Sequence, residues 1–149
     1  MTFDTPAPLR AEHEALHARL VEATRAPGAV GVAAREVARL LHPHFVREEA
    51  FALPPLALLA ELARGGATAE MAQVLPMTRR LEVELPAMLD EHAQIVAALQ
   101  ALRAAALEAG QPAHAAFADA LVEHAQTEEE VLYPAAILVG RQVAQALKA

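Results

Sequence analysis

An internal repeat places histidine and glutamate at the same positions in both halves of the chain. The segment HFVREEAFALP (44–54) aligns with HAQTEEEVLYP (124–134), and both have the form His-x3-Glu-Glu-x4-Pro. The segments AEHEAL (11–16) and DEHAQI (90–95) also align, because both contain Glu-His-x-x-(Leu/Ile). The two alignments have nearly equal offsets of 80 and 79 residues. This pattern predicts two helix pairs related by a pseudo-two-fold axis.

Glycine and proline divide the sequence into segments of helical length. The composition is 55% hydrophobic and only 3% aromatic, and its many Ala and Leu residues favour helix over strand. Breaks are expected at Ala26-Pro27-Gly28, at Gly65-Gly66 and at Gly110-Gln111-Pro112. We therefore expect helices at about residues 8–25, 30–63, 78–109 and 113–147, with boundaries uncertain by about two to four residues and a short helix at 69–75.

Prolines also fall inside these expected helices. Each removes a backbone donor and crowds the preceding turn, so it should kink or interrupt the helix. The prolines concerned are Pro43, Pro54, Pro55, Pro86 and Pro134. With 149 residues, the chain is long enough to bury the core of one domain. The predicted fold is all-α, an antiparallel four-helix bundle that forms a single domain over residues 1–149.

Polar side chains interrupt the apolar stripes of these helices. At about 100° per residue, side chains at i, i+3, i+4 and i+7 share one face. The last helix thus places Phe117, Leu121, His124, Glu128 and Val131 together. The polar residues within the four stripes are His13, His44, Glu48, His92, His124 and Glu128. Glu49, Glu129 and His42 lie about 100° or more away from the stripes, where exposure to solvent explains them without a function.

A carboxylate on an apolar face needs a positive partner. Burying one costs several kcal/mol unless it is paired or bound to a cation, and no Lys or Arg stands in the stripe beside Glu48 or Glu128. His44 and His124 each precede these glutamates by one helical turn, about 6 Å, so that both groups can converge on one centre. A single histidine on an apolar face is more often a core residue, but four with two carboxylates indicate bound metal.

The number of candidate ligands indicates two metal ions. Four histidines and two glutamates exceed what one tetrahedral zinc ion takes, and helical bundles hold two-metal carboxylate sites between facing helices. Imidazole and carboxylate ligands without sulfur are compatible with iron, manganese or zinc. The side-chain types therefore leave the identity of the metal open.

Other metal motifs fit the sequence less well. A ferritin-like site needs Glu-x-x-His on two helices, whereas only Glu14-Ala-Leu-His17 has that form and Glu14 points outward. His13-Glu14-Ala-Leu-His17 also matches the zinc-protease motif His-Glu-x-x-His, but the expected strands of such enzymes are absent from the prediction. His17 is either a fifth imidazole or a residue at the bundle boundary. Tyr133 is a hydrogen-bond donor to the site, a ligand or, in the favoured interpretation, an amphipathic residue at the core boundary.

These residues resemble the bacterial hemerythrin-like proteins of the HHE cation-binding family. The resemblance extends from Leu9 to Pro134 and rests on His13, His44-x3-Glu48-Glu49, Glu91-His92 and His124-x3-Glu128-Glu129. It implies an oxo- or hydroxo-bridged non-haem di-iron centre inside the bundle, with manganese or zinc not excluded. The implied metal ligands are His13, His44, Glu48, His92, His124 and Glu128. Glu48 and Glu128 would bridge the irons, with His13 and His44 on one iron and His92 and His124 on the other.

The chain departs from the oxygen-carrying hemerythrins at two positions. Those proteins have a His-x3-His pair on the third helix, whereas Val96 follows His92 at that spacing here. They also have an Asp five residues after the fourth-helix histidine, whereas here Glu128 follows His124 at four. Reversible oxygen carriage is therefore less securely implied than metal binding.

The resemblance implies a protein that binds or reacts with O2, NO or peroxide, in oxygen or redox handling or in iron homeostasis. Turnover of such a ligand is left open. The alternative is a non-catalytic helical module that holds zinc or another metal and acts through partner contacts, although the sequence names no protein partner. The net charge of -7 and the lack of any Lys/Arg run longer than two disfavour nucleic acid and anionic membranes as partners.

The termini and apolar runs bear on location. The segment MTFDTPAPLR lacks the basic and apolar regions of a signal peptide, and no apolar run is long enough to cross a bilayer. We therefore expect a soluble cytoplasmic protein. The absence of cysteine excludes disulfides, iron–sulfur ligation and thiol catalysis.

Overall fold

The computed structural model describes residues 3–148, and these residues contain helices and no strand. The α-helices are α1 (Ala7–Thr24), α2 (Gly28–Arg47), α3 (Leu59–Ala63), α4 (Leu75–Glu108), α5 (Pro112–Thr127) and α6 (Tyr133–Lys148). Two π-helical segments, Glu48–Ala52 and Glu128–Leu132, follow α2 and α5, and 3-10 segments span Pro54–Leu58 and Ala69–Val74. The predicted all-α fold is confirmed.

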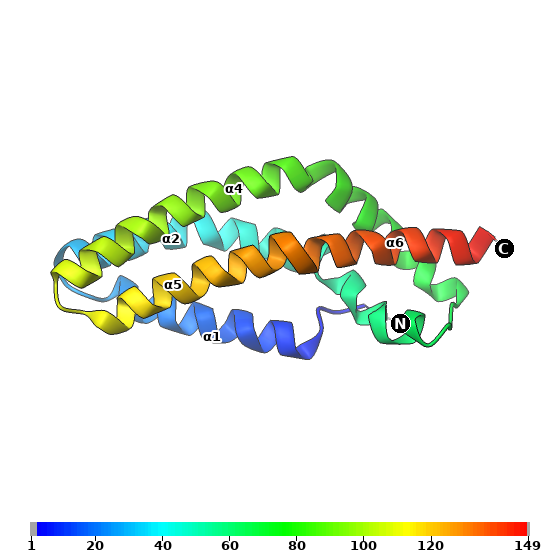
Figure 1. Ribbon diagram of the computed structural model, residues 1–149, viewed down its shortest axis with the longest axis horizontal. Coiled ribbons are helices and arrows are strands. Elements are labelled where there is room, and N and C mark those ends of the chain that lie inside the picture. The colour runs from blue at the N-terminus through cyan, green and yellow to red at the C-terminus, as the bar shows by residue number, and fades with distance from the viewer. Residues whose placement is uncertain (1–2, 149) are drawn as a thin grey trace.

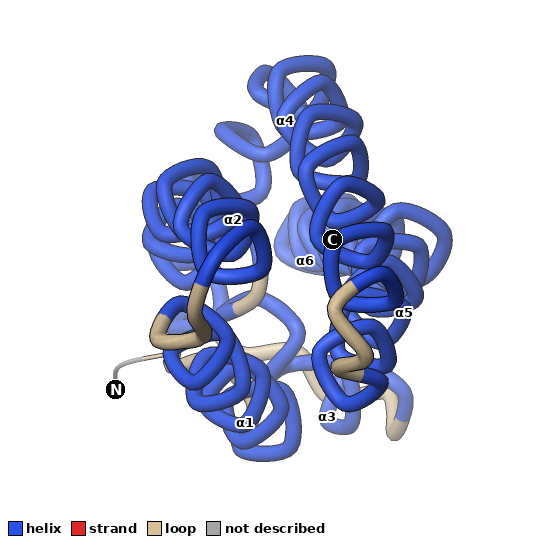
Figure 2. Tube along the Cα trace, turned by 90° about the vertical axis from the view of Figure 1, so that its left-hand side faces the viewer, coloured by secondary structure: helices blue, strands red, loops and turns tan. Residues whose placement is uncertain are grey.

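Helices α1, α2, α4 and α5 form the bundle, and neighbouring helices run in opposite directions (Figure 1). Helix α4 packs against α2 and α5, and α1 packs against the same two helices from the other side (Figure 2). Helix α6 continues the line of α5 and extends past the bundle, where α3 lies beside it (Figure 1). The antiparallel four-helix bundle predicted from the two helix pairs is confirmed.

Glycine ends the long helix α4, as predicted. Gly110 has a φ of 69°, a left-handed conformation that glycine adopts without a steric cost. The N–H of Gln111 donates to the carbonyl of Ala106 at 2.8 Å and so satisfies one of the free carbonyls of the last turn. The chain then reverses direction into α5.

The second expected helix, residues 30–63, is shorter and less regular than predicted. Helix α2 ends at Arg47, and the chain continues through the π-helical and 3-10 segments before α3. Pro54 and Pro55 begin the 3-10 segment, as their missing donors suggest. In contrast, Pro43 and Pro86 lie inside α2 and α4, which continue past them, and α4 is visibly bent (Figure 1).

Each π-helical segment begins at the inward glutamate of the repeat. The N–H of Leu53 donates to the Glu48 carbonyl at 2.9 Å, and the N–H of Tyr133 donates to the Glu128 carbonyl. A proline crowds the carbonyl four residues before it. For Pro54 and Pro134 that carbonyl lies within the π-helical segment, where the wider turn gives it room.

The extra residue in the wider turn changes which side chains face the core. Val131, expected on the inward stripe, is 56% exposed, whereas Tyr133 is 0% exposed. The prediction for Val131 was therefore wrong, because the 3.6-residue period stops at Glu128 and resumes one residue later. Ala136 and Val143 continue the shifted stripe along α6 and are buried.

Two apolar clusters lie on either side of the histidines and glutamates. One is built around Leu20, Leu41, Leu99, Phe117 and Leu121 from the four bundle helices. The other contains Phe51, Leu53, Leu81, Met88 and Tyr133. Full burial of each large side chain contributes about 1.5 to 3 kcal/mol, so the clusters stabilise the helices that hold the polar residues between them. Among the described residues, no helix combines the length and apolar character needed to cross a membrane.

Candidate metal centre

The six residues predicted as ligands lie together in the middle of the bundle. They come from four helices and the starts of both π-helical segments, and all are between 0% and 4% exposed. They form two groups whose potential ligand atoms lie within 4.8 Å of one another: His44, Glu48, His92 and Glu128; and His13, His124 and Glu128. Glu128 belongs to both groups.

The histidines pair differently from the arrangement that the resemblance implied. His13 lies with His124, and their Nε2 atoms are 3.2 Å apart. His44 lies with His92, and their ring centroids are 4.6 Å apart. The closest neighbours without metal are thus His13 with His124 and His44 with His92, whereas the expected assignment placed His13 with His44 and His92 with His124; which histidines share an ion stays a prediction. The pairing of the histidines depends on how the four helices are arranged around the site. The periodicity within one helix does not contain that information.

All four imidazoles direct Nε2 toward the two buried carboxylates. The distances from Nε2 to an oxygen of Glu48 or Glu128 are 3.7 Å for His13, 3.4 Å for His44, 3.3 Å for His92 and 3.3 Å for His124. Each group therefore brings imidazole nitrogens and carboxylate oxygens close together. Nδ1 of every ring points outward.

The buried carboxylates have free oxygen atoms and no cationic side chain beside them. Oε1 of Glu48 and Oε2 of Glu128 have no hydrogen-bond partner, and within residues 3–148 neither carboxylate forms an ion pair with Lys or Arg. Such oxygens are costly to bury. Their arrangement, with the inward nitrogens, fits a divalent cation in each group.

Burial and mutual repulsion divide the charge unequally between the two carboxylates. Burial raises the pKa of Glu48 well above its usual range, and the negative charge of Glu128 raises it further. Burial also opposes ionisation of Glu128, but the close contacts with Glu48 and His124 outweigh burial and lower the pKa of Glu128. Without metal, the opposite pKa shifts favour a proton on Glu48 beside an ionised Glu128.

The same surroundings keep His44 neutral. Burial, followed by the neighbouring His92, lowers the pKa of His44 to about 4. For His124, burial also favours the neutral ring, but the close contact with Glu128 outweighs it and raises the pKa of His124. A neutral imidazole presents a lone pair, as metal binding requires.

Tyr133 belongs to the site. Its hydroxyl donates to Oε2 of Glu48 at 2.8 Å and lies 3.2 Å from Nε2 of His92 and 3.3 Å from Nε2 of His44. Burial and the neighbouring Glu48 and Glu128 raise the pKa of Tyr133 well above its usual value. The interpretation of Tyr133 as a core-boundary residue was wrong, because the π-helical segment rotates it inward.

Two glutamates expected in solvent also contact the site. Glu49 and Glu129 are 48% and 39% exposed, so their exposed position was predicted correctly. However, Glu49 lies 3.5 Å from Nδ1 of His13, and Glu129 lies 3.0 Å from Nδ1 of His92. The interpretation without a function overlooked these contacts, although both glutamates recur in the repeat.

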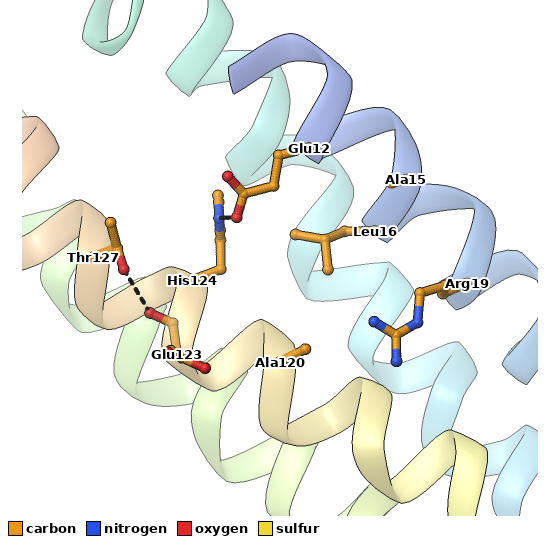
Figure 3. Close-up of a pocket in the computed structure, with 8 residues that line it drawn as sticks. All are labelled: Glu12, Ala15, Leu16, Arg19, Ala120, Glu123, His124 and Thr127. Atoms are coloured by element: carbon orange, nitrogen blue, oxygen red, sulfur yellow. Dashed lines mark hydrogen bonds and ion pairs between the residues drawn. The ribbon is translucent and has the colours of Figure 1, made fainter. Parts of the chain in front are cut away.

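A cleft between α1 and α5 reaches one group from the surface. It has a volume of about 370 Å³ and is lined by Glu12, Ala15, Leu16, Arg19, Ala120, Glu123, His124 and Thr127. Figure 3 shows Glu12 at the His124 ring, with Arg19 farther along α1. A second cleft, of about 290 Å³ between α1 and α2, includes His13, His17 and His42. His17 is exposed and outside both groups, which places it at the surface.

The bundle and its buried cluster define a class of helical metal-binding domains. The family model described as the hemerythrin HHE cation binding domain matches residues 4–136. The chain belongs to this family, and its buried His/Glu cluster is the corresponding candidate metal-binding site. Neither the curated proteins nor the solved structures give a significant match.

Proposed function

We propose that the protein binds two iron ions and uses them to bind or react with a small oxidant such as O2, NO or peroxide. The observation that carries the proposal is that Glu128 belongs to both groups. A carboxylate shared in this way would hold two ions side by side. The proposed ligands are His44, Glu48, His92 and Glu128 for one ion and His13, His124 and Glu128 for the other.

The donor atoms support two divalent ions. Two cations would neutralise the carboxylates, and the free oxygens Oε1 of Glu48 and Oε2 of Glu128 would gain partners. Nitrogen and oxygen donors suit iron, and they also suit manganese or zinc. Family membership supports the binding of a cation. The identification of that cation as iron is part of our proposal.

The surroundings support access by a small molecule and exclusion of bulk water. Bound iron would supply electrons for binding or reducing the oxidant. Leu16, Ile95 and Leu121 are buried in the apolar cluster beside the site and limit solvent entry. The cleft at His124 lies beside the group formed by His13, His124 and Glu128 and would admit a small molecule to its edge. That group has one fewer protein ligand, which would leave more coordination positions open.

Metal analysis of site variants tests the two-ion arrangement. Protein produced with added iron should contain close to two metal ions per chain. Glu128→Gln should lose metal from both groups, whereas the exposed neighbour Glu130→Gln should retain both ions. His13→Ala should lose one ion, and His17→Ala, one turn away but exposed, should lose none. Equal metal contents in Glu128→Gln and Glu130→Gln would contradict the proposal.

Reactivity requires a separate measurement. The iron-loaded protein is reduced without oxygen, mixed with one equivalent of O2, NO or peroxide, and monitored by absorption and by an electrode for the added molecule. We expect iron-dependent binding or consumption that His124→Ala weakens. Retention of zinc in preference to iron, with no response to any of the three molecules, would favour the non-catalytic alternative.

A further inference from the structure

Each of the four buried histidines has a carboxylate from another helix near its outward nitrogen. The distances from Nδ1 to the carboxylate oxygen are 2.8 Å for His124 and Glu12, 3.0 Å for His92 and Glu129, 3.5 Å for His13 and Glu49, and 3.8 Å for His44 and Glu91. The four pairs follow the repeat: Glu12 and Glu91 come from its Glu-His elements, and Glu49 and Glu129 from its Glu-Glu elements.

A carboxylate beside Nδ1 of a histidine also affects Nε2 on the opposite side of the ring. When Nδ1–H donates to the carboxylate, the proton stays on Nδ1 and the lone pair of Nε2 remains available. The same hydrogen bond restricts rotation of the imidazole. Because all four Nε2 atoms face the buried carboxylates, such a bond holds the ring in the orientation that a ligand needs.

The four pairs are not equivalent. Glu12 and Glu129 are within hydrogen-bond distance of His124 and His92. By contrast, Nδ1 of His13 and Nδ1 of His44 have no hydrogen-bond partner. Each group therefore contains one histidine whose Nδ1 is hydrogen-bonded to a carboxylate and one whose Nδ1 is not.

An ion pair with an arginine explains why Glu91 is not within hydrogen-bond distance of His44. Arg47 forms an ion pair with Glu91, and the remaining carboxylate oxygen lies 3.8 Å from Nδ1 of His44. The corresponding residue in the other half of the repeat is Thr127, whose hydroxyl donates to a backbone carbonyl in its own helix. Position 127 therefore supplies no cation to pair with Glu12, and Glu12 forms its hydrogen bond with His124.

We propose that Glu12 and Glu129 are positioning residues that orient His124 and His92 for metal binding, and that Arg47 withholds Glu91 from His44. This inference rests on the proposed two-metal function. It assigns one fixed and one freer imidazole to each metal position. The freer rings are His13, beside the cleft between α1 and α2, and His44.

Cobalt(II) binding tests the positioning role, because its affinity and its visible spectrum report on the ligands without any turnover. The variants are Glu12→Ala and Glu129→Ala, with the exposed neighbours Glu14→Ala and Glu130→Ala as matched controls. Glu12 and Glu129 are 50% and 39% exposed, so their replacement leaves the core packing intact.

Loss of a carboxylate behind a metal-binding histidine typically lowers metal affinity by about 10- to 100-fold. We expect a loss of this size for Glu12→Ala and Glu129→Ala in competition with a chelator, with a changed cobalt absorption spectrum. Glu12→Gln, whose amide oxygen still accepts a hydrogen bond, should recover part of the affinity and the original spectrum. Glu14→Ala and Glu130→Ala should match the unmodified protein.

Arg47 gives a test in the opposite direction. Arg47→Met should release Glu91 toward His44 and raise cobalt affinity by up to about 10-fold. Removing a positive charge also favours a cation by itself, so the variant is combined with Glu91→Gln in a double-mutant cycle. A gain that disappears in the Glu91→Gln background supports the proposal, and an equal gain in both backgrounds overturns the role of Arg47.

The outcomes separate this inference from the proposed function. If the unmodified protein binds no cobalt or only one ion, the two-metal function fails. If it binds two ions and Glu12→Ala and Glu129→Ala behave like their controls, the two-metal function stands and the positioning role is wrong.

Discussion

Metal binding should release a proton from Glu48. Burial and the charge of Glu128 raise the pKa of Glu48 well above its usual range, which favours the protonated carboxyl group in the metal-free protein. A metal ion requires the deprotonated form, and the proton must leave as the ion binds. His44, with a pKa of about 4, is already neutral and contributes no proton.

The number of released protons fixes the pH dependence of the affinity. For one proton, the affinity constant rises about 10-fold for each unit of increasing pH, or about 1.4 kcal/mol of binding free energy. The increase should continue up to the raised pKa of Glu48, because above it no proton has to be displaced. Below that pKa, lowering the pH weakens binding.

Isothermal titration calorimetry in buffers with different ionisation enthalpies counts these protons. At pH 7, we expect the unmodified protein to release about one proton more than Glu48→Gln. The difference isolates Glu48 from any contribution of His124, whose pKa is also raised. The same proton count in both proteins, or no release from the unmodified protein, would refute the assignment of the proton to Glu48.

Two further predictions concern stability. Tyr133→Phe removes the 2.8 Å hydrogen bond to Glu48 and should destabilise the metal-free protein by about 1 to 3 kcal/mol; urea unfolding measures this, and an unchanged midpoint would contradict it. Gly140→Ala would place Cβ 2.1 Å from Oγ1 of Thr78 and should cost about 1 to 3 kcal/mol through overpacking of α6 on α4. In Gly66→Ala the nearest atom is 3.6 Å away, so thermal unfolding of this control should be nearly unchanged.

The sequence was sufficient to predict the bundle and the inward position of the proposed ligands. Helical periodicity needs only local information, and within each helix it correctly placed the four histidines and two glutamates in the interior. It failed at Val131 and Tyr133, where the π-helical segment adds a residue to the turn. Pro54 and Pro134 predict kinks, whereas in the structure each follows a widened turn, and the turn before Pro134 brings Tyr133 inward.

The outer carboxylates show a second limit of the sequence pattern. A helical wheel gives the direction in which a side chain leaves the backbone, and by that measure Glu49 and Glu129 belong to the solvent-facing side. A glutamate has three side-chain torsions, so its carboxylate can reach back across the helix interface. Their contacts with His13 and His92 therefore depend on the neighbouring helix, and periodicity alone does not predict them.

Differences between the two halves of the repeat make the two proposed metal positions unequal. Tyr133 occupies the position equivalent to Leu53, so a hydroxyl group faces the group that contains His44 and His92. Two clefts are lined by proposed ligands of the other group, His124 and His13, whereas the cleft beside Tyr133 is lined by no proposed ligand. A buried proton donor beside one ion and an opening beside the other would give the two ions different tasks. We therefore expect an added ligand to bind first at the His13 and His124 position. His124→Ala should alter ligand binding more than it alters the ion held by His44 and His92, and metal analysis combined with ligand titration of that variant measures both.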